Sequence, residues 1–537
     1  TDVIEARAKA TSVNINADNL DSASLQKFQE AQSGLSSALS KLMVSVERYP
    51  QLTATQNFRN LQSQLEGTEN RINVERNRFN DNVREYNTYI RKFPNNIFAG
   101  MFGFERMTPF EAQAGAENAL GGIAQAGADN IPILVLPGGN PLNLLAVRPN
   151  YNVSDNYRGL VKHVEAIYRS DQFGDVMRRA FAGLRNGVPG PMVVELTSDV
   201  CSAETSQTLE DYASPSVSVH VPSSGDIHDA AQKLVDAKRP LLWAGGGVLA
   251  SRATEELREL AELIAAPVFT TMQGKSAIDE RHPLALGAGG GTTTGPAHEW
   301  LGSCDLMLAL GSSLTRTSYA QDVPQDAFLI QNTNNADEIG KEESIDIGLV
   351  GDTKLTLRGI IDEVKSMIGD EPRDSKSTVE QIAKIRSEWM AEWTPLLTSD
   401  KQPLNTYRVI HEINENIDLE NSIVAHDAGA PRDSIIPFFK ATTPHSYVGW
   451  GKTTHLGFGI PLMIGAKLAN PNKFCLNLMG DGAFGMSGTD IETASRSKVA
   501  ITTVLLNNGG MATYGPGMFP TAREQYGVSH MQGDYAM

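Results

Sequence analysis

Two short polar motifs in the last part of the chain carry residue types that bind a divalent cation. Gly480-Asp481-Gly482 follows one apolar run and Asn507-Asn508 ends the next, with 24 residues between the two motifs. A carboxylate and an amide oxygen are hard ligands of Mg²⁺, and a backbone carbonyl with diphosphate oxygens would complete its shell. The glycines let the backbone approach a phosphate closely. The two motifs together predict a Mg²⁺–diphosphate site, whereas Gly-Asp-Gly alone is usually a turn.

The segments around these motifs predict how they reach one site. Phe474–Met479 and Val499–Leu506 have the composition of buried strands, and a helical stretch lies between them near Gly488–Arg496. A strand–helix–strand crossover brings the ends of both strands to the same edge of a parallel sheet. We therefore expect Asp481 and Asn508 at one carboxyl edge.

The same alternation of strands and helices extends back to about residue 120. Further β-rich runs that end in glycine or polar turns are Ile131–Leu136, Met192–Leu196, Pro240–Ala244 and Asp305–Leu310. Such alternation predicts an α/β fold with parallel sheets. We divide it into blocks at residues 120–201, 220–370 and 375–537, separated by polar segments that suit linkers.

Residues 1–119 differ in composition, because they contain no His, Cys or Trp. Apolar residues recur at helical spacing from Leu25 to Tyr49 and again from Phe58 to Phe93, and a proline follows each stretch. This pattern predicts an all-α helical hairpin. No nucleophile stands beside a base and no metal-ligand cluster is present, so we expect a structural role.

The overall composition excludes several classes of protein. Among 537 residues, 46 are Lys or Arg and 63 are Asp or Glu, for a net charge of −17, which disfavours nucleic acid as a partner. The three cysteines are far apart in the chain, so neither a disulfide scaffold nor a Cys-rich zinc site is expected, and a reducing compartment is the default. No apolar run reaches the roughly 18 residues of a membrane span. The first residue is Thr1, no signal peptide is visible and the last residues trail off, so we expect truncation at both ends.

Residues 1–119 resemble the LemA family, in phrases that include ARAKATSVNINADNL and FAGMFGF. The resemblance implies a helical domain. Full-length LemA-like proteins are membrane-anchored, but this sequence shows no anchor, so membrane attachment is not carried over.

Residues from about 120 onward resemble thiamine-diphosphate-dependent enzymes of the acetolactate synthase family. The spacing of Gly-Asp-Gly and Asn-Asn is similar to the family's cofactor motif, and HLGFGIPLMIGAKLANP, GVPGPMVVELTSDV and ADEIGK resemble further segments. The resemblance implies a partial pyrimidine-binding domain, a central Rossmann-like domain and a truncated diphosphate-binding domain. It also implies a cytoplasmic enzyme part that is a homodimer or tetramer, with thiamine diphosphate and Mg²⁺ as cofactors.

The resemblance assigns roles to individual residues. The metal ligands would be the side chains of Asp481 and Asn508 and the carbonyl of Gly510. The cofactor contacts would be Gly429, Leu456, Gly480, Asp481, Gly482, Ala483 and Asn508. Leu456 occupies the place of an apolar residue that bends the cofactor into a V, although ordinary core packing is an alternative. The phrase DAGAPRD departs from the family's Gly-Gln-His, and Arg432 is the candidate to substitute for the missing side-chain contacts.

The reaction implied by the resemblance is decarboxylation or carboligation of 2-oxo acids. The family's activating glutamate lies in the first half of the pyrimidine-binding domain, where this chain has the LemA-like helices instead. Glu117 belongs to a later segment of the family pattern and is not assigned that role. We therefore leave the catalytic residues unassigned and expect impaired activity. The stretch Gly115–Ala119 suits both families, which suggests that two unrelated reading frames were joined there as a chimera.

Two alternatives remain open at this stage. The chain is a LemA-like, membrane-associated helical module with a vestigial α/β part, or it is an oxidoreductase that binds NAD or FAD at Gly245-Gly246-Gly247. Gly245-Gly246-Gly247 lacks the Gly-x-Gly-x-x-Gly spacing of a dinucleotide-binding turn, so a structural turn is favoured and FAD is unsupported.

Overall fold

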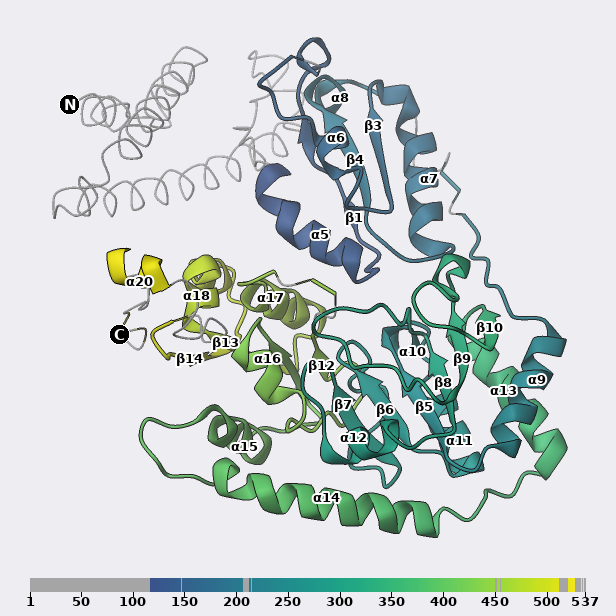
Figure 1. Ribbon diagram of the computed structural model, residues 1–537. Coiled ribbons are helices and arrows are strands. Elements are labelled where there is room, and N and C mark those ends of the chain that lie inside the picture. Colours follow the sequence, from purple (N-terminus) through teal and green to yellow (C-terminus); the bar gives the residue numbers. More distant parts are fainter. Residues whose placement is uncertain are drawn as a thin grey trace, which may run out of the picture. The chain divides into compact units, whose positions relative to one another are not determined.

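The computed structural model describes residues 116–145, 147–205, 212–213, 215–449, 452–453, 455–510, 520–526, 533 and 535. The chain divides into two units, Thr1–Gln113 and Ala114–Met537, and every described residue belongs to the second. The helical hairpin predicted for residues 1–119 therefore lies almost wholly outside the described residues. Within the second unit the chain forms three parallel sheets with helices between their strands (Figure 1), which confirms the α/β prediction.

The first sheet has four strands, and β4 pairs in parallel with each of the other three. Its strands are β1 (Leu134–Val135), β2 (Gly138–Gly139), β3 (His163–Ile167) and β4 (Met192–Thr197). The accompanying α-helices are α5 (Leu120–Ala128), α6 (Val153–Tyr157), α7 (Phe173–Arg185) and α8 (Ser198–Ser202), with short 3-10 turns at Ala116–Ala119, Leu142–Leu144 and Ser170–Gln172. Alternate residues of β4 face two small cores, with Met192 and Val194 on one side and Val193 on the other. The first strand is shorter than the predicted Ile131–Leu136.

The second sheet has six parallel strands in the order β10-β9-β8-β5-β6-β7, a doubly wound arrangement. Its strands are β5 (Pro240–Ala244), β6 (Val268–Thr271), β7 (Ala285–Gly289), β8 (Leu306–Leu310), β9 (Phe328–Thr333) and β10 (Ile347–Val350). Its helices are α9 (Ser224–Asp236), α10 (Gly246–Ala250), α11 (Thr254–Ile264), α12 (Gly295–Leu301) and α13 (Thr353–Ile368), with a 3-10 turn at Ala336–Glu338. Strands β5 and β8 are fully buried, and α9 and α13 pack side by side (Figure 1).

The third sheet has four parallel strands in the order β12-β11-β13-β14. They are β11 (Ser422–His426), β12 (Tyr447–Val448), β13 (Phe474–Gly480) and β14 (Thr502–Leu506). The helices of this part are α14 (Lys376–Leu397), α15 (Thr406–Asn416), α16 (Ala430–Ile435), α17 (Gly459–Ala469), α18 (Asp481–Ser487), α19 (Asp490–Arg496) and α20 (Pro520–Tyr526). The predicted strand before Asn507 starts at Thr502 rather than Val499, and the chain enters α18 at Asp481 without an intervening loop.

A buried ion pair joins the second sheet to the third part of the chain. The Lys275 ammonium lies 2.6 and 2.7 Å from the two carboxylate oxygens of Glu280, and both side chains are almost fully buried. Glu280 also forms two hydrogen bonds with Ala441. Its backbone N–H donates to the Ala441 carbonyl, and its Oε2 accepts from the Ala441 N–H. The pair therefore fixes the segment after β6 against the segment that leads into β12.

Candidate functional site

Asp481 stands at the carboxyl end of β13 and is the first residue of α18. Its side chain is only 1% exposed. Oδ1 accepts a hydrogen bond from the Gly482 N–H at 3.0 Å, whereas Oδ2 is buried and has no hydrogen-bond partner among the described residues. Because a buried carboxylate oxygen is costly to leave unsatisfied, Oδ2 calls for a ligand such as a cation.

Asn508 lies just beyond β14, the neighbour of β13. The two strands pair in parallel, with Gly480 opposite Leu506, so the residues that follow each strand emerge at the same carboxyl edge. Asn508 is exposed, and its Oδ1 accepts a hydrogen bond from the Gly510 N–H at 3.1 Å. This turn brings the Asn508 amide oxygen and the Gly510 backbone together, and the oxygen keeps a second lone pair for another partner.

The turn between β13 and α18 has room for a ligand beside its backbone. Gly480 caps α18 without a side-chain hydrogen bond, and a Cβ built on Gly480 would meet no atom of the described residues within 4 Å. Gly482 and Ala483 follow on the buried first turn of the helix. The open space next to Gly480 fits the prediction that this turn faces a phosphate.

Leu456 lies in the loop that precedes α17. It is partly buried and packs in one apolar cluster with Ile460, Met479 and Ala483. Met479 and Ala483 flank the turn that contains Asp481, so the Leu456 loop and the Asp481 turn lie side by side. This arrangement is compatible with support of a cofactor, and equally with core packing.

Gly429 lies after β11, the other neighbour of β13, and has a positive φ of 81° that favours glycine. It caps α16, which carries Arg432. The Arg432 guanidinium is buried, contacts Asp433 at 2.5 Å and stacks on the Tyr319 ring at 4.2 Å. Since Asp433 already balances its charge, Arg432 serves to dock α16 on Tyr319.

One residue of this region that the sequence did not single out is Asp427, directly after β11. It is 0% exposed, and its carboxylate accepts three backbone hydrogen bonds, from Ala428, Gly457 and Gly459. Burial raises the pKa of Asp427, and the backbone N–H groups oppose that shift. The available signal in the sequence was an acid directly after a buried strand, but two of its three partners, Gly457 and Gly459, lie 30 and 32 residues further on.

The glycines at 245–247 are explained by close packing. A Cβ on Gly245 would lie 2.5 Å from the Gly311 carbonyl oxygen, and one on Gly247 would lie 2.6 Å from the Gly311 Cα. The turn after β5 is therefore pressed against the segment after β8, as expected for a structural turn.

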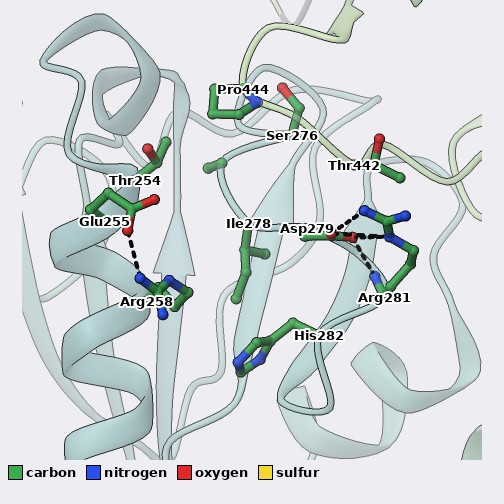
Figure 2. Close-up of a pocket in the computed structure, with 11 residues that line it drawn as sticks. Thr254, Glu255, Arg258, Ser276, Ile278, Asp279, Arg281, His282, Thr442 and Pro444 are labelled. Atoms are coloured by element: carbon green, nitrogen blue, oxygen red, sulfur yellow. Dashed lines mark hydrogen bonds and ion pairs between the residues drawn. The ribbon is translucent and has the colours of Figure 1, made fainter. Parts of the chain in front are cut away.

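A cavity of about 410 Å³ opens beside α11 and the segment after β6 (Figure 2). Its walls are charged, but Arg258 pairs with Glu255 at 2.6 Å and Arg281 pairs with Asp279 at 2.7 Å. None of the predicted cofactor residues lines it. Because its arginines are already paired, we assign no ligand to this cavity.

Comparison with known proteins finds different families in the first part of the chain and in the rest. Residues 1–120 match the LemA family. Residues 227–360 match the thiamine pyrophosphate enzyme central domain, and residues 427–535 match the thiamine pyrophosphate enzyme C-terminal TPP binding domain. Thiamine pyrophosphate is the same compound as thiamine diphosphate.

Individual relatives decide the family. The chain is 31% identical to a probable acetolactate synthase large subunit of Methanocaldococcus jannaschii over 411 residues, which cover 73% of this chain and 68% of the relative. It is 30% identical, with the same coverage, to the corresponding protein of Methanococcus aeolicus. The chain belongs to the acetolactate synthase family. A putative thiamine pyrophosphate-containing protein of Bacillus subtilis, YdaP, is 27% identical and 69% covered.

Membership of the acetolactate synthase family accounts for the second unit. The matched C-terminal TPP binding domain begins directly after β11 and contains β12, β13 and β14, and so includes Gly429, Asp481 and Asn508. Among the described residues no group of three His, Cys, Asp or Glu side chains forms a ready metal site. In the same part of the chain no helix is long and apolar enough to cross a bilayer.

Proposed function

We propose that this chain binds thiamine diphosphate with Mg²⁺ at the carboxyl ends of β11, β13 and β14 and acts on 2-oxo acids. The observation that carries the proposal is the Asp481 Oδ2 atom, which is buried without a partner beside the open backbone of Gly480. A hard carboxylate oxygen in this position suits Mg²⁺, and the open turn suits a diphosphate.

The predicted residues divide into two groups by the part of the cofactor they would hold. Asp481, Asn508 and the Gly510 carbonyl would provide the oxygen ligands of the metal. Gly429, Gly480, Gly482 and Ala483 would line the diphosphate, and Leu456 would support the rings. Diphosphate oxygens and water would complete the octahedral shell of the cation.

Bound thiamine diphosphate supplies an electron sink for the carbanion chemistry of 2-oxo acids. The protein's share is to orient the cofactor, exclude water and control protons. Where the acetolactate synthase family has its activating glutamate, this chain carries the LemA-like segment. We therefore expect cofactor binding with weak turnover, in a homodimer or tetramer.

Calorimetric titration of the full chain with thiamine diphosphate tests the proposal, in Mg²⁺ and in excess chelator. Binding is expected only with Mg²⁺. Asp481→Asn is expected to weaken it by about a hundredfold, because it removes a charged metal ligand from a buried site. Glu492→Gln is the matched control, since Glu492 pairs with Arg496 on the exposed face of α19. Equal binding by the Asp481 variant and the control would refute the site.

Thermal unfolding gives an independent measurement. A ligand at a hundred times its Kd stabilises the native state by about 2.7 kcal/mol, which shifts the melting temperature upward. Addition of pyruvate then measures turnover separately from cofactor binding. A chain that binds thiamine diphosphate but does not turn over pyruvate is thereby distinguished from one that binds no cofactor.

A further inference from the structure

The carboxylate of Asp427 connects two segments that are far apart in the sequence. Oδ1 accepts hydrogen bonds from the N–H groups of Ala428 at 2.7 Å and Gly457 at 3.1 Å, and Oδ2 accepts from Gly459 at 3.0 Å. The Asp427 N–H in turn donates to the Leu478 carbonyl of β13 at 2.8 Å. Asp427 is therefore anchored at the end of β11, and its carboxylate holds the loop before α17 through these hydrogen bonds.

The Asp427 carboxylate acts as the N-terminal cap of α17, which has no capping side chain of its own. The residue before α17, Phe458, offers no side-chain hydrogen bond to the helix, and the first N–H groups of a helix have no partner within it. Asp427 satisfies the N–H of Gly459, the first residue of the helix, from another strand. A negative charge at this end of a helix is also favourable.

The gripped loop is pressed against the Asp481 turn. Gly457 has a φ of +85°, and a Cβ there would lie 3.0 Å from Ser487 Oγ and 3.3 Å from the Ala483 carbonyl oxygen. A Cβ on Gly459 would lie 2.3 Å from the Asn477 side chain of β13. Leu456 immediately precedes this segment, so its position relative to Ala483 depends on how the loop is held.

We propose that Asp427 is a positioning residue that sets Leu456 against the β13–α18 turn, and thereby selects the ring orientation of the bound thiamine cofactor. The inference concerns ring orientation and so rests on the proposed function. The other part of the proposal, that Asp427 holds the loop before α17 in place, does not depend on a cofactor. The two halves therefore have separate tests.

Amide hydrogen exchange of the full chain without ligand tests the hold on the loop. Asp427→Asn keeps the shape of the side chain but turns one acceptor into a donor, so exchange is expected to rise about tenfold or more at Gly457 or Gly459, whichever N–H group then loses its acceptor. Asp418→Asn is the matched control, because Asp418 accepts backbone hydrogen bonds from Glu420 and Asn421 at the other end of β11. Unchanged exchange at both glycines would overturn the proposal.

Ligand titration tests the consequence for the cofactor. Asp427→Asn is expected to weaken thiamine diphosphate by roughly tenfold to a hundredfold and to change the near-ultraviolet circular dichroism of the bound cofactor. Binding of Mg²⁺ pyrophosphate, which lacks the rings, is expected to stay within about threefold. Equal weakening of both ligands would overturn the proposal, since the residue would then act on the diphosphate or on the fold.

Two further variants make the test decisive. If Asp427 acts through Leu456, the double variant Asp427→Asn, Leu456→Ala should bind thiamine diphosphate no more weakly than Leu456→Ala alone. Additive losses would contradict this. If Asp427→Asn fails to fold, Gly457→Ala displaces the same loop and is expected to give the same selective loss. A wild-type chain that binds neither ligand would refute the proposed function, while hydrogen exchange still decides the role of Asp427.

Discussion

Removal of the buried Lys275 ammonium is expected to destabilise the chain strongly. Lys275 is 1% exposed and Glu280 8%, and the ammonium contacts both carboxylate oxygens. Lys275→Met leaves the Glu280 carboxylate buried, with the Ala441 N–H as its remaining hydrogen-bond donor among the described residues. Breaking such a pair from one side costs about 3–5 kcal/mol.

The second substitution in a double-mutant cycle identifies the cause of this loss. Burial lowers the pKa of Lys275, and the facing Glu280 carboxylate opposes that shift, so Glu280 favours the charged form of Lys275. Glu280→Gln keeps an oxygen for the Ala441 N–H and removes the charge. The double variant is therefore expected to be more stable than Lys275→Met alone, by about 2 kcal/mol.

Urea unfolding followed by tryptophan fluorescence measures these differences as shifts of the midpoint. Lys384→Met is the matched control, because the Lys384–Glu388 pair is 4.0 Å apart and both side chains are mostly exposed. The control is expected to change stability by under about 0.5 kcal/mol. A Lys275 variant no less stable than this control, or additive losses in the double variant, would refute the reasoning.

Two further predictions concern titration and thiol reactivity. Burial lowers the pKa of His426 from 6.5 to about 3, so below the ordinary pKa the unfolded chain binds a proton that the folded chain does not. The free energy of unfolding should fall as the pH drops from about 6.5 towards 3, by at most about 4–5 kcal/mol. The fall should be smaller in His426→Gln. If the midpoint of urea unfolding decreases equally with pH in both proteins, the prediction is wrong. Cys201 is exposed, whereas burial raises the pKa of Cys304 to about 11 and also raises that of Cys475, so at about pH 8 maleimide should label only Cys201 quickly. Rapid labelling of all three thiols, measured by mass spectrometry, would contradict the burial of the other two.

Local patterns in the sequence predicted much of the second unit. The apolar run Pro240–Ala244 is a strand with the predicted bounds, because a buried strand between turn residues is a short-range signal. The parallel pairing of β13 and β14 follows from the length of chain between them, which fits one crossover. Errors occur at element ends, such as Thr502 in β14, where a few apolar residues remain outside the ladder. The roles of Asp481 and Asn508 stay predictions, and the adjacency of their two strands supports them.

The sequence by itself determined the fold class, the family and the motif positions, because periodicity, turn chemistry and motif spacing are all read along a short stretch of chain. Only the tertiary structure decided which buried charges share partners. Asp427 holds Gly457 and Gly459, and Glu280 holds Ala441 across 161 residues. No local pattern encodes such contacts, since they form only when folding brings distant segments into one solvent-free place. There each polar atom must find a partner or remain, as Asp481 Oδ2 does, available for a ligand.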